Sequence, residues 1–250
     1  MKFFYHFFLF LLSVFFYSCK DSHSNFQTVK SQNLKETVEI IGIPKDDSSS
    51  LEKYFVSKNL VDLNTIDSSI RVTLLYSTTH NFLQKQIYFG LKKCYLPMEV
   101  ALKLKKAQEY LKFDFPLYSL IVFDGTRPLS IQKKMWNELV LPDKIKINYL
   151  ANPNDISLHN YGAAVDIGII GENQVLLDMG TSFDFFGELS EPKKEKIFYE
   201  SGKLSKEAFA NRLLLRNTMV KAGFLSITSE WWHFNYTTKK EAATKFELIQ

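Results

Sequence analysis

The chain has 250 residues, of which 46% are hydrophobic and 23% charged, and its formal net charge is +4. This composition is ordinary for a globular protein and excludes a chain that is disordered throughout. The lysines are spread along the sequence and form no basic stripe interleaved with aromatic residues, which excludes a nucleic-acid-binding protein. The length fits one folded domain of about 100–200 residues with an N-terminal extension.

Residues 1–19 are typical of a lipoprotein-type signal peptide. Lys2 precedes an almost wholly apolar run from Phe3 to Tyr17, which at about 15 residues is shorter than the ~20 needed to span a bilayer. Ser18 and Cys19 end this run, and we expect Cys19 to carry a lipid. The alternatives are an ordinary signal peptide and an uncleaved anchor. The sequence thus predicts an exported protein, either periplasmic or a membrane-anchored lipoprotein.

Residues 20–55 are predicted to form a polar tether, and residues 56–250 the folded domain. The tether contains the run Asp46–Ser50, and its composition is too polar to bury enough surface to offset the entropy of ordering. With Cys19 lipidated, Cys94 is the one remaining cysteine and has no partner for an intramolecular disulfide. We therefore expect Cys94 to be a small buried apolar residue.

Strand patterns recur through the folded domain. Runs rich in β-branched and aromatic residues predict strands within residues 60–75 and at 118–123, 163–170 and 224–236. These strands alternate with helices in no regular βαβ rhythm, which indicates the α+β class.

Apolar residues at helical spacing predict helices between these strands. The first begins at Pro97, the second contains Ile131 and Leu139, and the third is marked by Phe209, Leu213 and Val220 and ends at Gly223. Two long irregular segments remain, residues 141–157 and 171–204, and we expect them to form the walls of a site.

His159 and Asp166 are candidate metal ligands. They are seven residues apart, with Gly162 between them to let a loop turn into the strand that carries Asp166. Asp166 has apolar neighbours, and a carboxylate there is costly unless it is paired or bound to a metal. The alternative is a structurally paired aspartate beside an ordinary loop histidine.

His233 and Glu230 complete the set that a mononuclear zinc hydrolase requires: three protein ligands, an open position for water, and a base beside it. Glu230 lies three residues before His233, and on a regular strand residues three apart point to opposite faces. A bulge, a twist or a strand end is therefore needed for Glu230 to act as the base. The alternative is a solvated surface carboxylate.

Arg127 follows the predicted strand at 118–123 and precedes Pro128 in a turn that begins at Asp124. A guanidinium held there is able to stabilise the oxyanion of a tetrahedral intermediate. The alternative is a structural salt bridge between Arg127 and Asp124 or Asp178.

Taken together, the motifs resemble the D-alanyl-D-alanine dipeptidase family of zinc peptidases, which is related to the zinc D,D-carboxypeptidases and has the hedgehog/D,D-peptidase fold. The family pattern Ser-x-His-x-x-Gly-x-Ala-x-Asp is complete at Ser157 to Asp166, and Glu-x-x-His at Glu230 and His233. Asp-Gly-x-Arg-Pro, Leu75 to Phe82 and Met179 to Asp184 extend the resemblance. One departure is Leu75, where the family commonly has arginine.

The resemblance implies an α+β fold with a central, mostly antiparallel sheet and flanking helices. It implies one Zn²⁺ per chain bound by His159, Asp166 and His233. Glu230 is then the general base and acid, and Arg127 stabilises the transition state. Asp184 is expected to hold the free amino group of the substrate, and Ser157 to contact the substrate.

The implied function is hydrolysis of the D-Ala-D-Ala dipeptide to free D-alanine, in cell-wall peptide turnover or glycopeptide resistance. One alternative is a zinc D,D-carboxypeptidase or endopeptidase that acts on longer peptidoglycan peptides. Another is a non-catalytic wall-binding module. Apart from a small dipeptide and a lipid anchor at Cys19, the sequence indicates no obligate protein partner.

Overall fold

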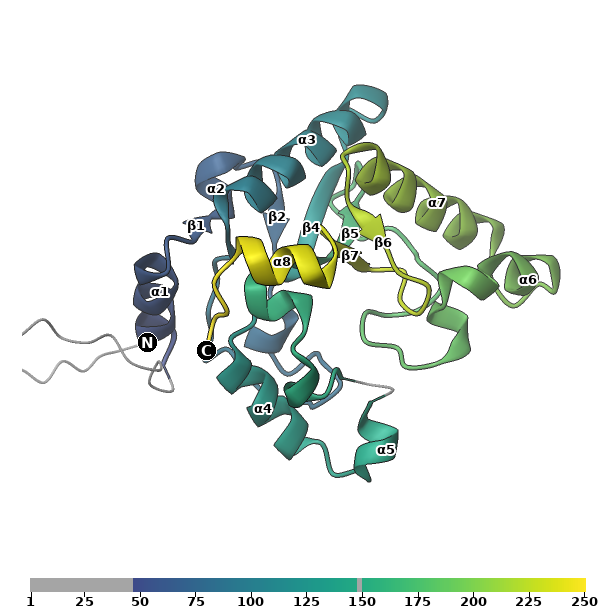
Figure 1. Cartoon of the computed structure of the whole chain (residues 1–250). Helices are drawn as coiled ribbons and strands as arrows, with labels where there is room; N and C mark the ends of the chain where they lie inside the picture. The colour runs from purple at the N-terminus through teal and green to yellow at the C-terminus, as the bar shows by residue number, and fades with distance from the viewer. Residues whose placement is uncertain (1–46, 148–149) are drawn as a thin grey trace, which may run out of the picture. The chain divides into compact units, whose positions relative to one another are not determined.

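The computed structural model describes residues 47–147 and 150–250 (Figure 1). The predicted signal peptide, Cys19 and the tether up to residue 46 lie outside the described residues. Within the described part, no helix is both long enough and apolar enough to cross a membrane.

Helices and strands alternate along the described chain. The helices are α1 (Ser48–Ser57), α2 (Leu63–Ile66), α3 (Met98–Asp114), α4 (Leu129–Glu138), α5 (Asp143–Lys146), α6 (Glu195–Glu200), α7 (Lys206–Lys221) and α8 (Lys239–Lys245). The strands are β1 (Val61–Asp62), β2 (Arg71–Val72), β3 (Tyr95–Leu96), β4 (Ser119–Asp124), β5 (Ala164–Ile170), β6 (Leu225–Ser226) and β7 (His233–Asn235). Short 3-10 turns are η1 (Leu75–Ser77), η2 (Pro153–Asp155), η3 (Leu158–Tyr161), η4 (Glu188–Ser190) and η5 (Pro192–Lys194).

The larger sheet has the strand order β2-β4-β5-β7-β6. β2 pairs with β4 in parallel, whereas β4–β5, β5–β7 and β7–β6 are antiparallel. β1 and β3 form a separate antiparallel pair. The fold is therefore mixed α+β, as the sequence predicts.

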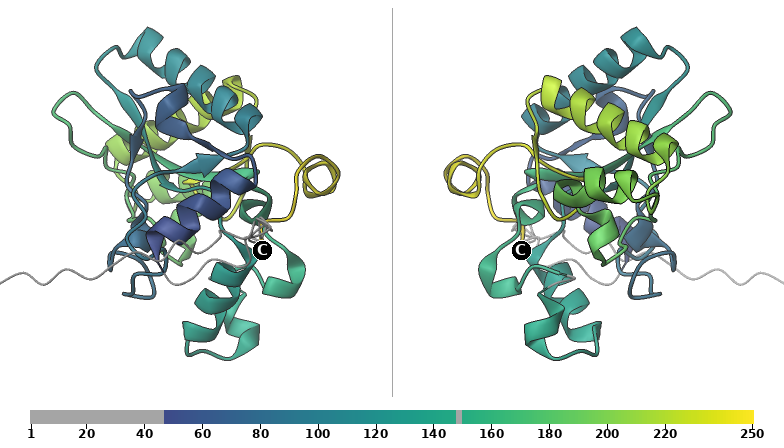
Figure 2. Two further views of the ribbon diagram at one scale, coloured as in Figure 1. Left: turned by 90° about the vertical axis from the view of Figure 1, so that its left-hand side faces the viewer. Right: turned by 90° about the vertical axis from the view of Figure 1, so that its right-hand side faces the viewer.

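The core lies where β4 and β5 meet the long helices. Leu120, Val122, Ile167 and Ile169 are fully buried on these two central strands. α3 packs against both β4 and α7, and the two helices lie side by side on one side of the sheet (Figure 2). The site residues come from the ends of the central strands, so this packing gives them a rigid support. Leu75, the departure from the family pattern, is partly buried against the same core.

Helix α1 corrects the predicted start of the folded domain. Asp47 caps this helix by accepting a hydrogen bond from the Ser50 amide at 2.8 Å. Leu51, Tyr54 and Phe55 on its inner face are buried in the main core. The tether prediction was therefore wrong for residues 48–55, because Asp47 and the three serines that follow it form a helix N-terminus rather than part of a linker.

Two further predictions differ from the structure in detail. The expected strand at 224–236 is two short strands, β6 and β7, joined by a loop that contains Trp231 and Trp232. Both tryptophans are buried, which a regular strand does not allow when only one of its faces is covered. Helix α7 ends before Gly223 as predicted, and Gly223 has φ +96°, but the residues that mark the helix in the sequence, Phe209, Leu213 and Val220, do not form its buried face. That face consists of Ala208, Arg212, Leu215, Thr218 and Met219.

Candidate active site

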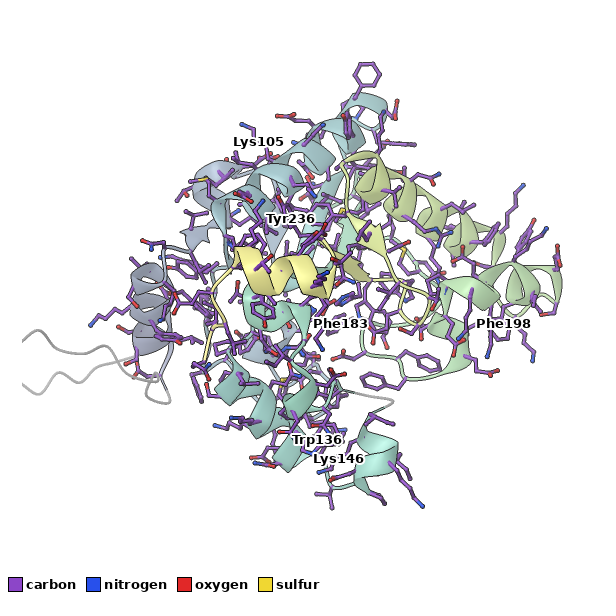
Figure 3. All side chains as sticks on the ribbon, viewed as in Figure 1. Lys105, Trp136, Lys146, Phe183, Phe198 and Tyr236 are labelled. Atoms are coloured by element: carbon purple, nitrogen blue, oxygen red, sulfur yellow. The ribbon has the colours of Figure 1, made fainter. Side chains whose placement is uncertain are left out.

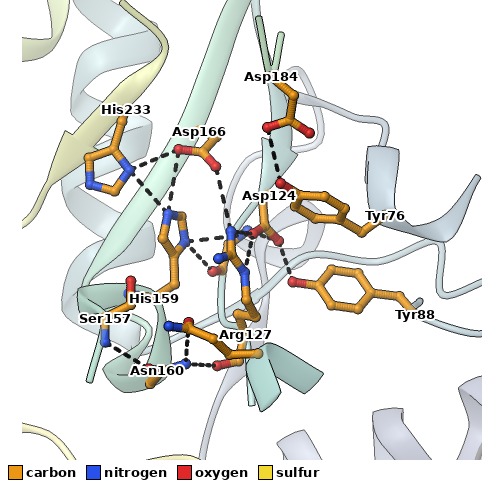
Figure 4. Close-up of polar contacts among 12 residues, drawn as sticks. Tyr76, Tyr88, Asp124, Arg127, Ser157, His159, Asn160, Asp166, Asp184 and His233 are labelled. Carbon is orange, nitrogen blue, oxygen red and sulfur yellow. Dashed lines mark hydrogen bonds and ion pairs between the residues drawn. The ribbon is translucent and has the colours of Figure 1, made fainter. Parts of the chain in front are cut away.

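Three candidate ligands meet at the centre of the sheet. Asp166 on β5 is paired in register with His233 on β7, and His159 reaches them from η3 (Figure 4). Asp166 Oδ1 lies 3.0 Å from His233 Nδ1 and 3.4 Å from His159 Nε2, and the two imidazole nitrogens are 3.2 Å apart. Ligands of a tetrahedral ion bound at about 2.0–2.1 Å lie about 3.3–3.4 Å from one another, so this triangle fits a metal ion.

Hydrogen bonds at the far side of each imidazole determine which nitrogen faces the cluster. His159 Nδ1 lies 2.8 Å from the carbonyl oxygen of Gly125, and His233 Nε2 lies 2.7 Å from Asn235 Oδ1. Because both partners are acceptors, these two nitrogens carry the protons of the neutral rings. In these neutral forms the lone pairs of His159 Nε2 and His233 Nδ1 converge with the Asp166 carboxylate, an arrangement that a bound cation would stabilise.

The charges within the cluster also favour a cation between its three side chains. Burial opposes ionisation of Asp166, yet the two histidines hold its pKa well below the usual range. Burial also lowers the pKa of His233, but the hydrogen bond and charge of Asp166 outweigh it and raise that pKa to about 9. The buried site therefore favours a positive charge between these three side chains.

Glu230 lies beside the cluster. Its Oε2 is 3.9 Å from His233 Nδ1, and burial raises the pKa of its carboxyl. Glu230 belongs to the loop before β7 rather than to the strand, so the rule that residues three apart face opposite sides does not apply to it. This resolves the conflict that the sequence pattern presented.

Arg127 makes the salt bridge with Asp124 that the sequence offered as an alternative, and it also lines the cavity. Its Nη2 and Nε both donate to Asp124 Oδ2, at 2.6 and 3.0 Å. Nη2 lies 4.0 Å from Asp166 Oδ2, and the guanidinium is 5.2 Å from the centroid of the Tyr76 ring. Tyr88 donates to the other oxygen of Asp124 at 2.6 Å. The guanidinium is therefore held in place beside the ligand cluster.

The turn that carries Arg127 and the turn that carries His159 are bonded to each other. The Arg127 amide donates to the His159 carbonyl at 2.9 Å. Asn160 Nδ2 donates to the Arg127 carbonyl at 2.8 Å, and Asn160 Oδ1 accepts from the Ser157 amide at 2.8 Å. Ser157 caps η3 through its hydroxyl, which accepts from the His159 amide at 3.3 Å. Ser157 therefore shapes the ligand loop as well as lining the cavity.

Asp184 has a carboxylate oxygen without a partner. Its Oδ1 accepts from the Tyr76 hydroxyl at 3.1 Å, whereas Oδ2 is buried and has no hydrogen-bond partner among the described residues. Burial, followed by the charge of Asp166, raises the pKa of Asp184 well above its usual range. The backbone of Asp184 has φ +58°, in the left-handed region that few residues other than glycine, asparagine and aspartate adopt. A cationic group of a ligand would satisfy this carboxylate.

All seven predicted site residues line one cavity of about 690 Å³, namely Arg127, Ser157, His159, Asp166, Asp184, Glu230 and His233. The two irregular segments supply walls, as predicted: Ile145 and Leu150 from one, Phe185 and Glu188 from the other. The wall formed by residues 141–157 is connected to α4 by Lys146, whose Nζ donates a hydrogen bond to the Trp136 carbonyl at 2.8 Å (Figure 3). Cys94 is buried outside this cavity, as expected.

Replacing Gly162 by alanine is expected to destabilise the protein by about 2–4 kcal/mol. Gly162 has φ +63°, and an added Cβ would lie 2.6 Å from both Pro97 Cδ and Thr126 Oγ1. Gly202, with φ +74° and no neighbouring atom within 4 Å, provides the matched control for backbone strain alone. Denaturant unfolding should show a clearly smaller loss for Gly202→Ala. Equal losses would mean that the contacts at Gly162 contribute nothing.

Asp184→Asn is expected to gain stability relative to the wild type as the pH rises. A carboxyl whose folded-state pKa is raised loses its proton first in the unfolded state, so the wild type is destabilised with increasing pH above the ordinary carboxyl range. Thermal unfolding of the metal-free proteins at about pH 5 and about pH 8 measures this difference. Glu188→Gln should show no such trend between these two pH values. The hydrogen bond and ion pair with Lys194 lower the pKa of exposed Glu188, so its contribution to stability changes only below the ordinary carboxyl range.

Comparison with known proteins identifies the family to which the chain belongs. The Peptidase_M15 family model, described as D-ala-D-ala dipeptidase, matches residues 56–249. The D-alanyl-D-alanine dipeptidase of Escherichia coli (strain K12) is 31% identical over 175 residues, which cover 70% of this chain and 83% of that protein. The proteins of the same name from Synechocystis sp. and Enterococcus faecalis are 28% and 25% identical, over 59% and 72% of this chain and 71% and 92% of their own lengths. This chain belongs to the D-ala-D-ala dipeptidase family of metallopeptidases.

Proposed function

We propose that this protein is a zinc-dependent dipeptidase that hydrolyses D-Ala-D-Ala to free D-alanine. The observation that carries the proposal is the pairing, in one cavity, of a three-ligand cluster with a buried carboxylate oxygen that lacks a partner. The D-alanyl-D-alanine dipeptidases to which the chain is similar support the choice of substrate.

Zinc is the metal that the ligands fit best. Two imidazole nitrogens and one carboxylate oxygen form a donor set of catalytic zinc sites, which keep a fourth position open. Bound by His159, Asp166 and His233, the ion would supply a Lewis acid that polarises the scissile carbonyl and acidifies water.

The remaining side chains divide the other tasks. Glu230 removes a proton from the attacking water and delivers it to the leaving amine, a role for which its raised carboxyl pKa suits it. Arg127 stabilises the negative charge that develops on the carbonyl oxygen. Asp184 accepts hydrogen bonds from the substrate's free ammonium group, and Tyr76 holds that carboxylate by its other oxygen. Ser157 contacts the substrate from the edge of the ligand loop.

Asp184 also explains why a dipeptide is favoured over a longer peptide. A buried carboxylate favours an ammonium group and rejects the neutral amide that a longer chain presents at the same position, because the carboxylate would then stay unpaired. The competing function, a D,D-carboxypeptidase or endopeptidase, does not need a carboxylate at this position.

Hydrolysis assays with the purified full-length protein test the proposal. We expect turnover of D-Ala-D-Ala that a chelator removes and Zn²⁺ restores, and much lower turnover of N-acetyl-D-Ala-D-Ala and of a pentapeptide that ends in D-Ala-D-Ala. Preference for the pentapeptide would support the carboxypeptidase instead. A zinc-loaded protein that hydrolyses none of these substrates would support the wall-binding module.

We also propose that the protein is exported and anchored by a lipid at Cys19, where it would recover D-alanine from cell-wall turnover. The apolar run from Phe3 to Tyr17 and the Ser18-Cys19 pair that follows support this location. Labelling with a radioactive fatty acid tests it. Label on the wild type but not on Cys19→Ala is expected, and an unlabelled wild type would rule the anchor out.

A further inference from the structure

Arg212 is a buried cation that has no role in the proposed reaction. It projects from the inner face of α7 and is 2% exposed. Burial lowers the pKa of its guanidinium to about 10, so it remains charged at neutral pH. None of the ion pairs among the described residues includes it, since the nearby carboxylate of Glu195 pairs with Arg216. Burying a charge in this way is costly, which indicates a specific task.

The partners of Arg212 are two backbone carbonyls that are ten residues apart. Its Nε donates to Met179 O at 2.6 Å, and its Nη1 donates to Leu189 O at 2.9 Å. Residues 179–189 form what we call the Asp184 loop, because Asp184 lies at its middle. Arg212 thus holds both ends of this loop with one rigid group, as only a planar fork of donors can do.

The Asp184 loop has little other support from the backbone. Between Gly180 and Phe185, the described residues provide no backbone–backbone hydrogen bond from the loop to another element. Side chains hold it instead. Phe183 packs between the rings of Tyr76, Phe123 and Trp232, and Thr181 Oγ1 accepts from Trp231 Nε1 at 2.7 Å. The location of the Asp184 carboxylate therefore depends on a few side-chain contacts.

Arg212 also touches the segment that carries Glu230. Its guanidinium carbon lies 6.0 Å from the centroid of the Trp231 ring. Trp231 is the residue that follows Glu230 in the sequence. Trp231 in turn donates to Thr181 of the Asp184 loop. One buried cation therefore contacts the loop that holds the substrate's amino group and the loop that supplies the base.

We propose that Arg212 is the positioning residue for Asp184: by binding the carbonyls at both ends of the Asp184 loop, it determines where that carboxylate lies in the cavity and hence how tightly a substrate ammonium is bound. This inference rests on the proposed function for its kinetic part. Its structural part, the closure of the loop, is independent of the substrate.

The kinetic test is a double-mutant cycle in the full-length protein. Lysine at position 212 keeps the charge but cannot bond both carbonyls, so Arg212→Lys should raise KM for D-Ala-D-Ala about tenfold or more and change kcat by less than about threefold. In an Asp184→Asn background, the same substitution should change kcat/KM by less than about threefold, because the carboxylate that it positions is already lost. Zinc content should stay the same throughout. An equal loss in both backgrounds would overturn the proposal.

The matched control is Arg216→Lys, one turn further along α7. Arg216 bonds Glu195 on α6, at 3.1 Å from Nη1, and contacts neither end of the Asp184 loop. Its replacement should leave KM unchanged. Arg212→Gln serves as a second variant that removes the charge, and it should raise KM at least as much as Arg212→Lys.

Limited proteolysis tests the closure of the loop whether or not the protein hydrolyses D-Ala-D-Ala. Chymotrypsin cleaves after Phe183, Phe185 and Phe186, all within the Asp184 loop. We expect cleavage there to be about fivefold faster or more in Arg212→Lys than in the wild type or Arg216→Lys. Unchanged cleavage would overturn the positioning role. An inactive wild type with faster cleavage in Arg212→Lys would overturn the proposed function alone.

Discussion

Glu230→Gln is expected to lower kcat for D-Ala-D-Ala by about 10³-fold or more while zinc content stays unchanged. The substitution keeps the size and polarity of the side chain but removes its ability to accept a proton from water and to return it to the leaving amine. Glu230 contacts the ligand cluster only at 3.9 Å, from Oε2 to His233 Nδ1, so binding of the metal does not depend on it. Steady-state kinetics and metal analysis on the same samples measure both quantities.

The control for Glu230 is Glu188→Gln, which removes another carboxylate from the wall of the same cavity. Glu188 is exposed and pairs with Lys194, so its loss should change kcat by less than about threefold. Residual activity of Glu230→Gln near the wild-type level would refute its role as base. Loss of zinc from that variant would instead make Glu230 part of the metal site.

Arg127→Lys is expected to lower kcat by about 10²–10³-fold with a much smaller change in KM. Arginine at this position places its guanidinium between Asp124 and the ligand cluster, with Nη2 at 2.6 Å from Asp124 Oδ2 and 4.0 Å from Asp166 Oδ2. A lysine ammonium cannot make the paired bonds to Asp124 and at the same time face the developing oxyanion. An interaction made only in the transition state affects kcat rather than substrate binding.

Tyr88→Phe separates this effect from damage to the buried salt bridge. It removes the hydrogen bond of 2.6 Å from the Tyr88 hydroxyl to Asp124 Oδ1 without touching the guanidinium, and it leaves the Gly125 amide donating to the same oxygen at 2.9 Å. We expect Tyr88→Phe to lose stability in thermal unfolding but to keep kcat within about fivefold of the wild type. If both variants lose kcat equally, Arg127 acts by holding Asp124 rather than by stabilising charge.

The ligand cluster could be predicted from the sequence because its chemistry is concentrated in few residue types. Histidine is rare in this chain, and both ligand histidines lie in short motifs with a carboxylate nearby. Asp184 has no such local signal: it lies in an irregular segment, and only the family resemblance indicated it. Its positive φ and the carboxylate oxygen that has no partner among the described residues are visible only in three dimensions.

The partners that orient the ligands could not be predicted. His159 is held by the carbonyl of Gly125, and a backbone carbonyl leaves no trace in the residue type. Tyr88 bonds Asp124 across a long separation in sequence. Asn235 is the exception, because it lies two residues from His233 on β7 and residues two apart on a strand share a face. The same limit applies to Arg212, since an arginine in a helix is expected to face solvent unless the tertiary structure provides partners.

The fold was predictable where elements are long and less so where they are short. The helix that begins after Pro97 and the strands β4 and β5 have patterns long enough to identify. β6 and β7 are too short to show a period, and the buried tryptophans between them mimic a strand. In α7, several neighbouring leucines make the apolar face ambiguous, and the contacts with α3 and the sheet decide which side is buried.

The ligand cluster and the Asp184 loop are supported by parts of the structure that differ in the free energy needed to open them locally. The three candidate metal ligands lie on or beside β5 and β7, whose backbone bonds belong to the middle of the larger sheet. Among the described residues, the part of the Asp184 loop from Gly180 to Phe185 makes no backbone–backbone hydrogen bond to another element and is held mainly by side chains. Exposing the ligands therefore requires disruption of the cooperative core, whereas we expect the Asp184 loop to open at a lower free-energy cost. Repeated entry of substrate and release of product can then occur while the ligand geometry stays intact.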